Sequence, residues 1–131
     1  MAIPELDHIK MVLKKHLQTK NEILFAYLHG SSIEHNKYND IDVAVYINEN
    51  TILPKNILDY EIDMSLGLER KLGYLVDFRV LNSSTSAFAY HATAGMLLFS
   101  RDDMTRFTFI EKIWQQYFDY QHFVRSYIKD I

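Results

Sequence analysis

Three aspartates, Asp40, Asp42 and Asp77, are the residues of this 131-residue sequence whose type and spacing best suit catalysis. Asp40 and Asp42 lie two apart at the start of the apolar run IDVAVYI, which is typical of a β-strand. Their side chains should therefore share one face, while Ile41 and Val43 point into the core. Two carboxylates that close resist ionising together, and a divalent cation relieves the conflict. Ligands that are all oxygen favour Mg²⁺, Mn²⁺ or Ca²⁺ over zinc.

Asp77 lies inside a second strand-like run, YLVDFRVL, at residues 74–81. If this strand pairs beside residues 41–47, the three acids can hold two metal ions about 4 Å apart for in-line phosphoryl transfer. Asp77 would then bind the second metal and serve as a base for the attacking hydroxyl. The alternative is structural: Asp77 pairs with Arg79 on the same strand face, and Asp40 and Asp42 form a solvated strand start.

A short polar loop, residues 30–39, precedes the first two acids and begins with Gly30, Ser31 and Ser32. Glycine allows the backbone to approach a ligand closely, and serine hydroxyls with nearby amides can donate to phosphate oxygens. The alternative is an ordinary turn. His29 and His35 flank the loop and are candidates for phosphate contact or for local hydrogen bonds.

These residues need elements that bring them together. Periodicity predicts helices at about 5–18, 55–72 and 102–128, and a short helix that follows Asn82–Thr85 and ends near Ala94. Strands are predicted at 23–29, 41–47, 74–81 and at the run MLLF. This order predicts an α+β fold, a small mixed sheet backed by helices with a long C-terminal helix, in a single domain over residues 1–131.

The last predicted helix has two apolar sets and a charged start. Asp102 and Asp103 should cap its N-terminus. One stripe is the predicted core face, and a second aromatic set lies off it as a candidate surface for a partner or for self-association. The first comprises Ile110, Ile113, Trp114, Tyr117, Val124 and Ile128, and the second Tyr120, Phe123 and Tyr127.

Composition narrows the function classes. The formal net charge of −3 argues against direct DNA binding through phosphate neutralisation. The absence of cysteine excludes disulfides, cysteine nucleophiles and iron–sulfur clusters, and fits a cytoplasmic protein. No run is long and apolar enough for a membrane span or an export signal, so a membrane role is not expected.

The joint pattern is far more specific than its parts. Gly-Ser, a spacer, Asp-x-Asp and a later strand Asp, here Gly30, Ser31, Asp40, Asp42 and Asp77, resemble the signature of the polymerase-β nucleotidyltransferase superfamily. The segments VDFRVLNSS, GMLLFSRDDMTRFTFIEK and YFDYQHFVRSYI are similar to its minimal, MntA-like antitoxins, which pair with HEPN-type toxins. The likeness spans about residues 22–128.

The resemblance implies a palm-like nucleotidyltransferase fold and a Mg²⁺-dependent transfer of AMP from ATP to a tyrosine of a HEPN RNase toxin. By position, Gly30, Ser31 and Ser32 would bind the nucleotide. Asp40, Asp42 and Asp77 would be catalytic and would bind two Mg²⁺ ions. The toxin is the expected partner, and a homo-oligomer is possible.

Two alternatives stay open. The loop continues as Ser32-Ile33-Glu34-His35, without the arginines and second glycine common in the family. A catalytically weak or inactive antitoxin that neutralises its toxin by binding is therefore one alternative. A small-molecule, antibiotic-type nucleotidyltransferase is the other, because one fold hosts several chemistries.

Overall fold

The structure is a computed structural model that describes residues 2–30 and 40–129. Its helices are α1 (Ala2–Gln18), α3 (Ile57–Leu72), α4 (Ser86–Thr93) and α5 (Asp103–Lys129), with a 3₁₀ turn η1 (Pro54–Asn56) before α3. Its strands are β1 (Ile23–His29), β2 (Asp40–Ile47), β3 (Leu75–Val80) and β4 (Met96–Ser100). The predicted order of helices and strands is confirmed, and the element ends move by one to three residues.

The strands of the described residues form one mixed sheet in the order β3-β2-β1-β4. β1 pairs antiparallel with β2 and β4, whereas β2 and β3 run parallel. A parallel neighbour needs a crossover, and α3 supplies it between β2 and β3. The predicted mixed α+β architecture is therefore confirmed.

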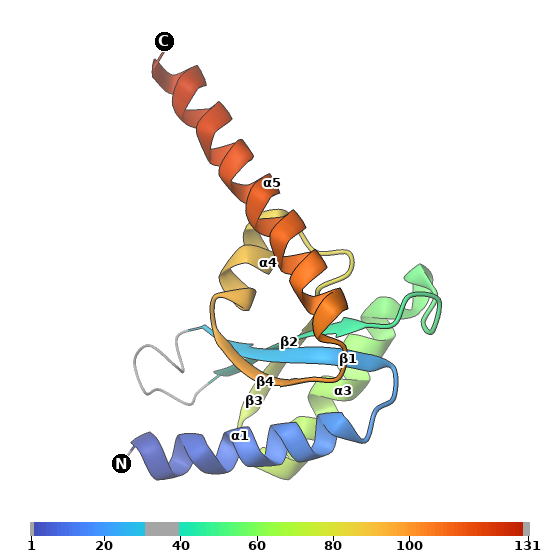
Figure 1. Cartoon of the computed structure of the whole chain (residues 1–131). Helices are drawn as coiled ribbons and strands as arrows, with labels where there is room; N and C mark the ends of the chain where they lie inside the picture. Colours follow the sequence, from blue (N-terminus) through green and yellow to red (C-terminus); the bar gives the residue numbers. More distant parts are fainter. Residues whose placement is uncertain (1, 31–39, 130–131) are drawn as a thin grey trace.

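Helices cover both faces of the sheet (Figure 1). α1 and α3 pack on one face, where Leu13, Leu17 and Leu68 join the buried side chains Ile41 and Val43. Alternation along β2 explains this burial, since successive strand residues point to opposite faces.

α4 and the start of α5 pack on the other face of the sheet. There Ala89, Ala92 and Ile113 meet Phe25 and Ala44 in a second buried cluster. Asp40 and Asp42 point toward this second layer because they alternate with the buried Ile41 and Val43.

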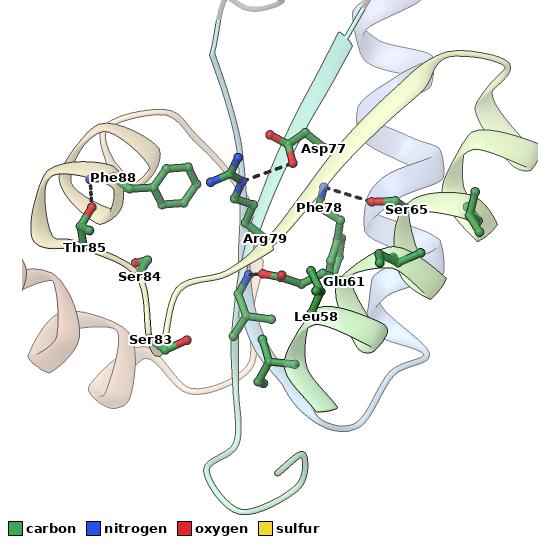
Figure 2. A pocket seen from close by; sticks show the side chains of 14 residues that line it. Leu58, Glu61, Ser65, Asp77, Phe78, Arg79, Ser83, Ser84, Thr85 and Phe88 are labelled. Atoms are coloured by element: carbon green, nitrogen blue, oxygen red, sulfur yellow. Dashed lines mark hydrogen bonds and ion pairs between the residues drawn. The ribbon is translucent and has the colours of Figure 1, made fainter. Parts of the chain in front are cut away.

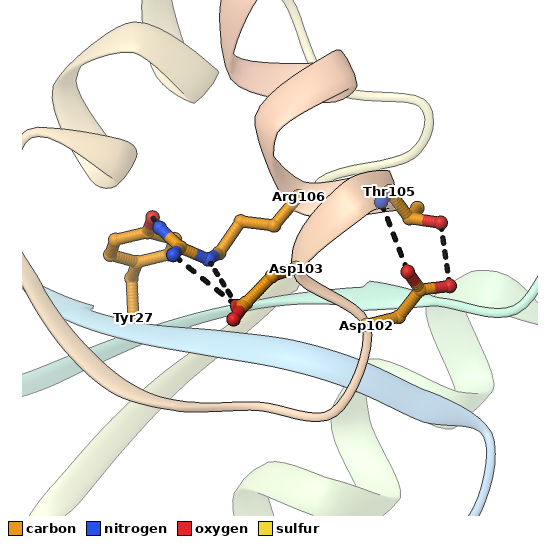
Figure 3. Close-up of polar contacts among 5 residues, drawn as sticks. All are labelled: Tyr27, Asp102, Asp103, Thr105 and Arg106. Atoms are coloured by element: carbon orange, nitrogen blue, oxygen red, sulfur yellow. Dashed lines mark hydrogen bonds and ion pairs between the residues drawn. The ribbon is translucent and has the colours of Figure 1, made fainter.

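The start of α5 is anchored by polar contacts (Figure 3). Asp102 caps the helix, accepting from the backbone N–H of Thr105 at 3.1 Å and from its hydroxyl at 2.7 Å. Arg106 donates to the Tyr27 hydroxyl at 3.2 Å and forms an ion pair with Asp103 at 3.3 Å. The predicted capping by Asp102 is confirmed, and Arg106 ties the helix to β1.

The far half of α5 extends away from the rest of the chain (Figure 1). Ile113 is buried, but Ile128 is 63% exposed, so its predicted place on the core face is wrong. The reason is geometric: the helical repeat continues beyond the end of the sheet and of α4. The second aromatic set is also exposed, with Tyr120, Phe123 and Tyr127 each at least 60% accessible. Among the described helices, none has a stretch long and apolar enough to cross a membrane.

Candidate functional site

The pairing of β2 with β3 brings the predicted acids onto neighbouring strands. In the parallel register Asp42 lies directly opposite Asp77, and Asp40 opposite Leu75. Asp42 is half-buried, while Asp40 and Asp77 are exposed. Because residues opposite one another in paired strands project to the same side, the three carboxylates share the sheet face that α4 and α5 cover. The pairing of β2 beside β3, on which the predicted arrangement of the acids depends, is therefore present.

The electrostatics of Asp42 reflect this crowding. Burial raises the pKa of Asp42 above its ordinary value, and the charges of Asp77 and Asp40 raise it further, while Arg79 opposes them. A carboxyl whose ionisation is disfavoured by like charges gains from a bound cation, which removes the repulsion. The electrostatics therefore favour a positive charge in front of β2 and β3.

Arg79 supplies part of that positive charge. Its Nε lies 3.3 Å from Asp77 Oδ1, and its guanidinium carbon lies 5.3 Å from the ring centroid of Phe88 on α4. The ion pair between Asp77 and Arg79, which the strand spacing suggested, is thus present. It coexists with the alignment of Asp77 opposite Asp42. Both partners are about half exposed, so the pair contributes little to folding stability.

Gly30 fixes how closely β1 approaches Asp42. Its φ is +88°, and a Cβ built there would lie 2.1 Å from Asp42 Oδ2. Any side chain would both strain the backbone and push the carboxylate aside. Gly95, in the turn between α4 and β4, is equally confined, since a Cβ there would lie 2.5 Å from the Leu28 carbonyl oxygen.

His29 ends β1 beside the acids. Its ring lies edge-on to Phe88, with centroids 5.4 Å apart. Burial lowers the pKa of His29 to about 4; Asp77 opposes this shift, and Arg79 adds to it. The imidazole is therefore neutral at pH 7 and adds no positive charge for a phosphate.

The strand that carries Asp77 is held by a set of polar side chains that sequence reasoning missed. β3 is an edge strand, and the outward N–H groups of Val76, Phe78 and Val80 donate to side chains of α3. The acceptors are Glu69 Oε2 at 3.0 Å, Ser65 Oγ at 3.3 Å and Glu61 Oε2 at 2.9 Å. Their spacing of four along α3 was the available signal, because it places them on one helix face.

This edge-capping row (Glu61, Ser65 and Glu69) has two consequences. It satisfies N–H groups that would otherwise recruit a further strand. It also fixes β3 against α3, and so holds Asp77 opposite Asp42.

The predicted metal ligands are the three acids on β2 and β3. No three described His, Asp or Glu side chains approach one another closely enough to hold a metal ion. The donor chemistry nevertheless fits a hard cation, because all three acids supply oxygen and Asp42 carries the repulsion that a cation relieves. Ser31 and Ser32, like His35, lie outside the described residues, so their assignment stays a prediction.

The sequence comparison identifies the family. Residues 12–104 match the model of the polymerase beta nucleotidyltransferase domain, which includes β1, β2 and β3 with all three acids. The chain belongs to this nucleotidyltransferase family. The expected superfamily is confirmed, although none of the curated protein sequences compared with the chain matches it significantly.

Solved structures share the whole fold. A crystal structure of the toxin–antitoxin MntA–HepT aligns over 95% of this chain and 97% of that chain, with a TM-score of 0.72 and 19% identity. A tri-AMPylated HEPN toxin from Shewanella oneidensis in complex with its MNT antitoxin aligns over 96% and 97%, with a TM-score of 0.70 and 20% identity.

A third structure, a toxin–antitoxin with AMP-PNP, aligns over 92% of this chain and 94% of that chain, with a TM-score of 0.69 and 19% identity. At these identities the likeness establishes the fold that the MntA resemblance implied.

Proposed function

We propose that this chain is an antitoxin that transfers AMP from ATP to a tyrosine hydroxyl of a HEPN-type RNase toxin. The observation that carries the proposal is the parallel register of β2 and β3, which sets Asp42 opposite Asp77 within a nucleotidyltransferase family match. The toxin as acceptor is supported by the shared fold of antitoxins solved with HEPN toxins, one of them tri-AMPylated.

Each residue has a role in this reaction. Gly30, which lets the end of β1 lie against Asp42, would bind the triphosphate together with Ser31 and Ser32. Asp40, Asp42 and Asp77 would hold Mg²⁺, which supplies charge neutralisation at the phosphates and lowers the pKa of a bound hydroxyl. Asp77, the acid on the edge strand, accepts the proton of the acceptor hydroxyl.

A labelling experiment tests this function. The purified chain is incubated with Mg²⁺, the protein encoded by the adjacent reading frame, and ATP labelled on either the α- or the γ-phosphate. Transfer of AMP predicts label on the partner from α-labelled ATP only, on a tyrosine, and its loss in Asp77→Asn. Label from γ-labelled ATP would indicate a kinase, and label on an aminoglycoside with none on the protein would indicate a small-molecule transferase.

A second function is favoured by one observation, the exposed aromatic side chains on the far half of α5. An antitoxin with such a surface can neutralise its partner by binding alone, since large exposed apolar patches mark interaction sites. The double variant Asp40→Asn with Asp42→Asn separates the two functions. If neutralisation requires AMP transfer, this variant fails to protect cells from the partner. If binding alone neutralises the partner, the variant still protects them.

A further inference from the structure

A cavity of about 610 Å³ lies beside β3, the edge strand of the sheet. Figure 2 shows α3 on one side of it and the turn at Ser83 and Ser84, with the start of α4, on the other. Asp77 and Arg79 of β3 lie between these two walls. The cavity therefore opens onto the carboxylate that the proposed reaction places next to the acceptor.

One wall of the cavity is an apolar row on α3. Leu58, Ile62 and Leu66 line it and are 65%, 48% and 47% exposed. Their spacing of four puts them on one helix face, apart from Met64 and Leu68, which pack under the sheet. Three large aliphatic side chains left open in a row are unusual for a surface that meets only water.

The other wall combines an aromatic ring with charge. Phe88 faces the cavity from α4, and Arg79 lies over its ring while pairing with Asp77. Glu61, also on the cavity wall, accepts the Val80 N–H. The charged residues of this lining are Glu61, Asp77 and Arg79. Asp77 is assigned to the metal, so the charges of Glu61 and Arg79 balance and the lining left to the acceptor is mainly apolar.

The sheet order sets the direction from which an acceptor can arrive. Gly30 lies at the end of β1, Asp42 on β2 and Asp77 on β3, which is the edge strand. In an in-line displacement the attacking oxygen and the leaving pyrophosphate lie on opposite sides of the α-phosphorus. A triphosphate held at Gly30 therefore requires an acceptor that enters over β3, where the cavity lies.

We propose that this cavity is the acceptor subsite and that it takes a segment of the partner protein. The segment presents a hydroxyl to Asp77 and places apolar side chains on Leu58, Ile62 and Leu66. A protein segment suits the open apolar row better than a small molecule, because it brings its own covering surface. This inference rests on the proposed function.

The covalent step at the subsite balances as follows. A bond forms between the acceptor oxygen and the α-phosphorus of ATP. The bond from that phosphorus to the oxygen bridging to the β-phosphate breaks, and pyrophosphate leaves with the electron pair. The acceptor proton passes to the Asp77 carboxylate. The products are the adenylylated partner and pyrophosphate.

The test replaces part of the apolar row by polar side chains. The double variant Ile62→Ser with Leu66→Ser changes two exposed residues, so the fold should persist. The matched control, Met11→Ser with Met104→Ser, changes side chains that are 60% and 76% exposed and lie outside the cavity. The KM for the partner from the adjacent reading frame and the Kd of a fluorescent ATP analogue are measured for both.

The acceptor subsite predicts a rise of about ten-fold or more in KM for the partner in the cavity variant, with the Kd of the ATP analogue and the control unchanged. An unchanged KM would overturn the acceptor assignment, as would a loss of nucleotide binding, which would make the cavity part of the ATP site. If the wild-type chain transfers no AMP to the partner, the proposed function fails and the acceptor assignment with it. If the wild type transfers AMP and the cavity variant has the same KM for the partner, only the acceptor assignment is overturned.

Discussion

The contact between Gly30 and Asp42 gives the sharpest single-residue prediction, the effect of Gly30→Ala. At φ +88° an alanine costs about 1–2 kcal/mol more than glycine. Its Cβ would lie 2.1 Å from Asp42 Oδ2, whereas ordinary contact begins at 3.4 Å, so the carboxylate must move by more than 1 Å. An off-rotamer Asp42 adds about 0.5–1.5 kcal/mol.

Gly73 provides a matched control. It ends α3 at φ +77°, and a Cβ there meets nothing within 4 Å. Gly73→Ala therefore carries the backbone cost of about 1–2 kcal/mol without touching Asp42. For 131 residues, each kcal/mol lowers Tm by about 3–4 °C, so the control should lose about 3–8 °C.

The two variants should separate in activity more than in stability. Gly30→Ala should lower Tm somewhat further than the control and reduce AMP transfer about 100-fold, because a misplacement of about 1 Å at a reacting centre costs that much. Gly73→Ala should keep transfer within about two-fold of wild type when measured well below its Tm. Thermal unfolding measures the change in Tm, and the rate of AMP transfer measures the change in activity. Equal loss of transfer in the two variants would refute the argument, as would full transfer by Gly30→Ala.

Three further predictions follow from the surroundings of single residues. Asp42→Asn should raise Tm while abolishing transfer, since it removes a carboxylate whose ionisation burial and Asp77 disfavour; a lower Tm would contradict this. Glu61→Ala should lower kcat more than Glu61→Gln, because glutamine can still accept the Val80 N–H. If the two variants have the same Tm and the same kcat, Glu61 does not position β3. The Thr105 hydrogen bonds lower the pKa of Asp102, so its stabilisation is present above the ordinary pKa and is lost as pH falls through the lowered value. Asp102→Ala should therefore be less stable than wild type at pH 7 in thermal scans and should converge with it in acid.

Local pattern was sufficient to predict the candidate acids. Alternation along IDVAVYI placed Asp40 and Asp42 on one face, and the polar interruption of YLVDFRVL marked Asp77. The sequence does not establish the parallel pairing of β2 and β3 that brings these acids onto neighbouring strands. It depends on a crossover through α3 and on register, both set by long-range packing.

Three features depended on tertiary contacts and were missed or predicted wrongly. The edge-capping row on α3 has a helical spacing, but only the position of β3 gives Glu61 and Glu69 their N–H partners. The apolar row containing Ile62 shares a helix with the core stripe, and sequence alone does not say which face is covered. Ile128 continues the core repeat of α5 beyond the point where the sheet ends, so periodicity predicted a burial that the fold does not provide.

In the proposed reaction, the acids on β2 and β3 transfer AMP to a partner protein. The most direct measurement is the intact mass of the protein from the adjacent reading frame after co-expression with the wild-type chain or with the Asp40→Asn, Asp42→Asn double variant. Transfer of AMP by these acids predicts one or more added AMP masses with the wild type and an unmodified partner with the variant. A partner that is neutralised by both chains and keeps its unmodified mass would contradict it.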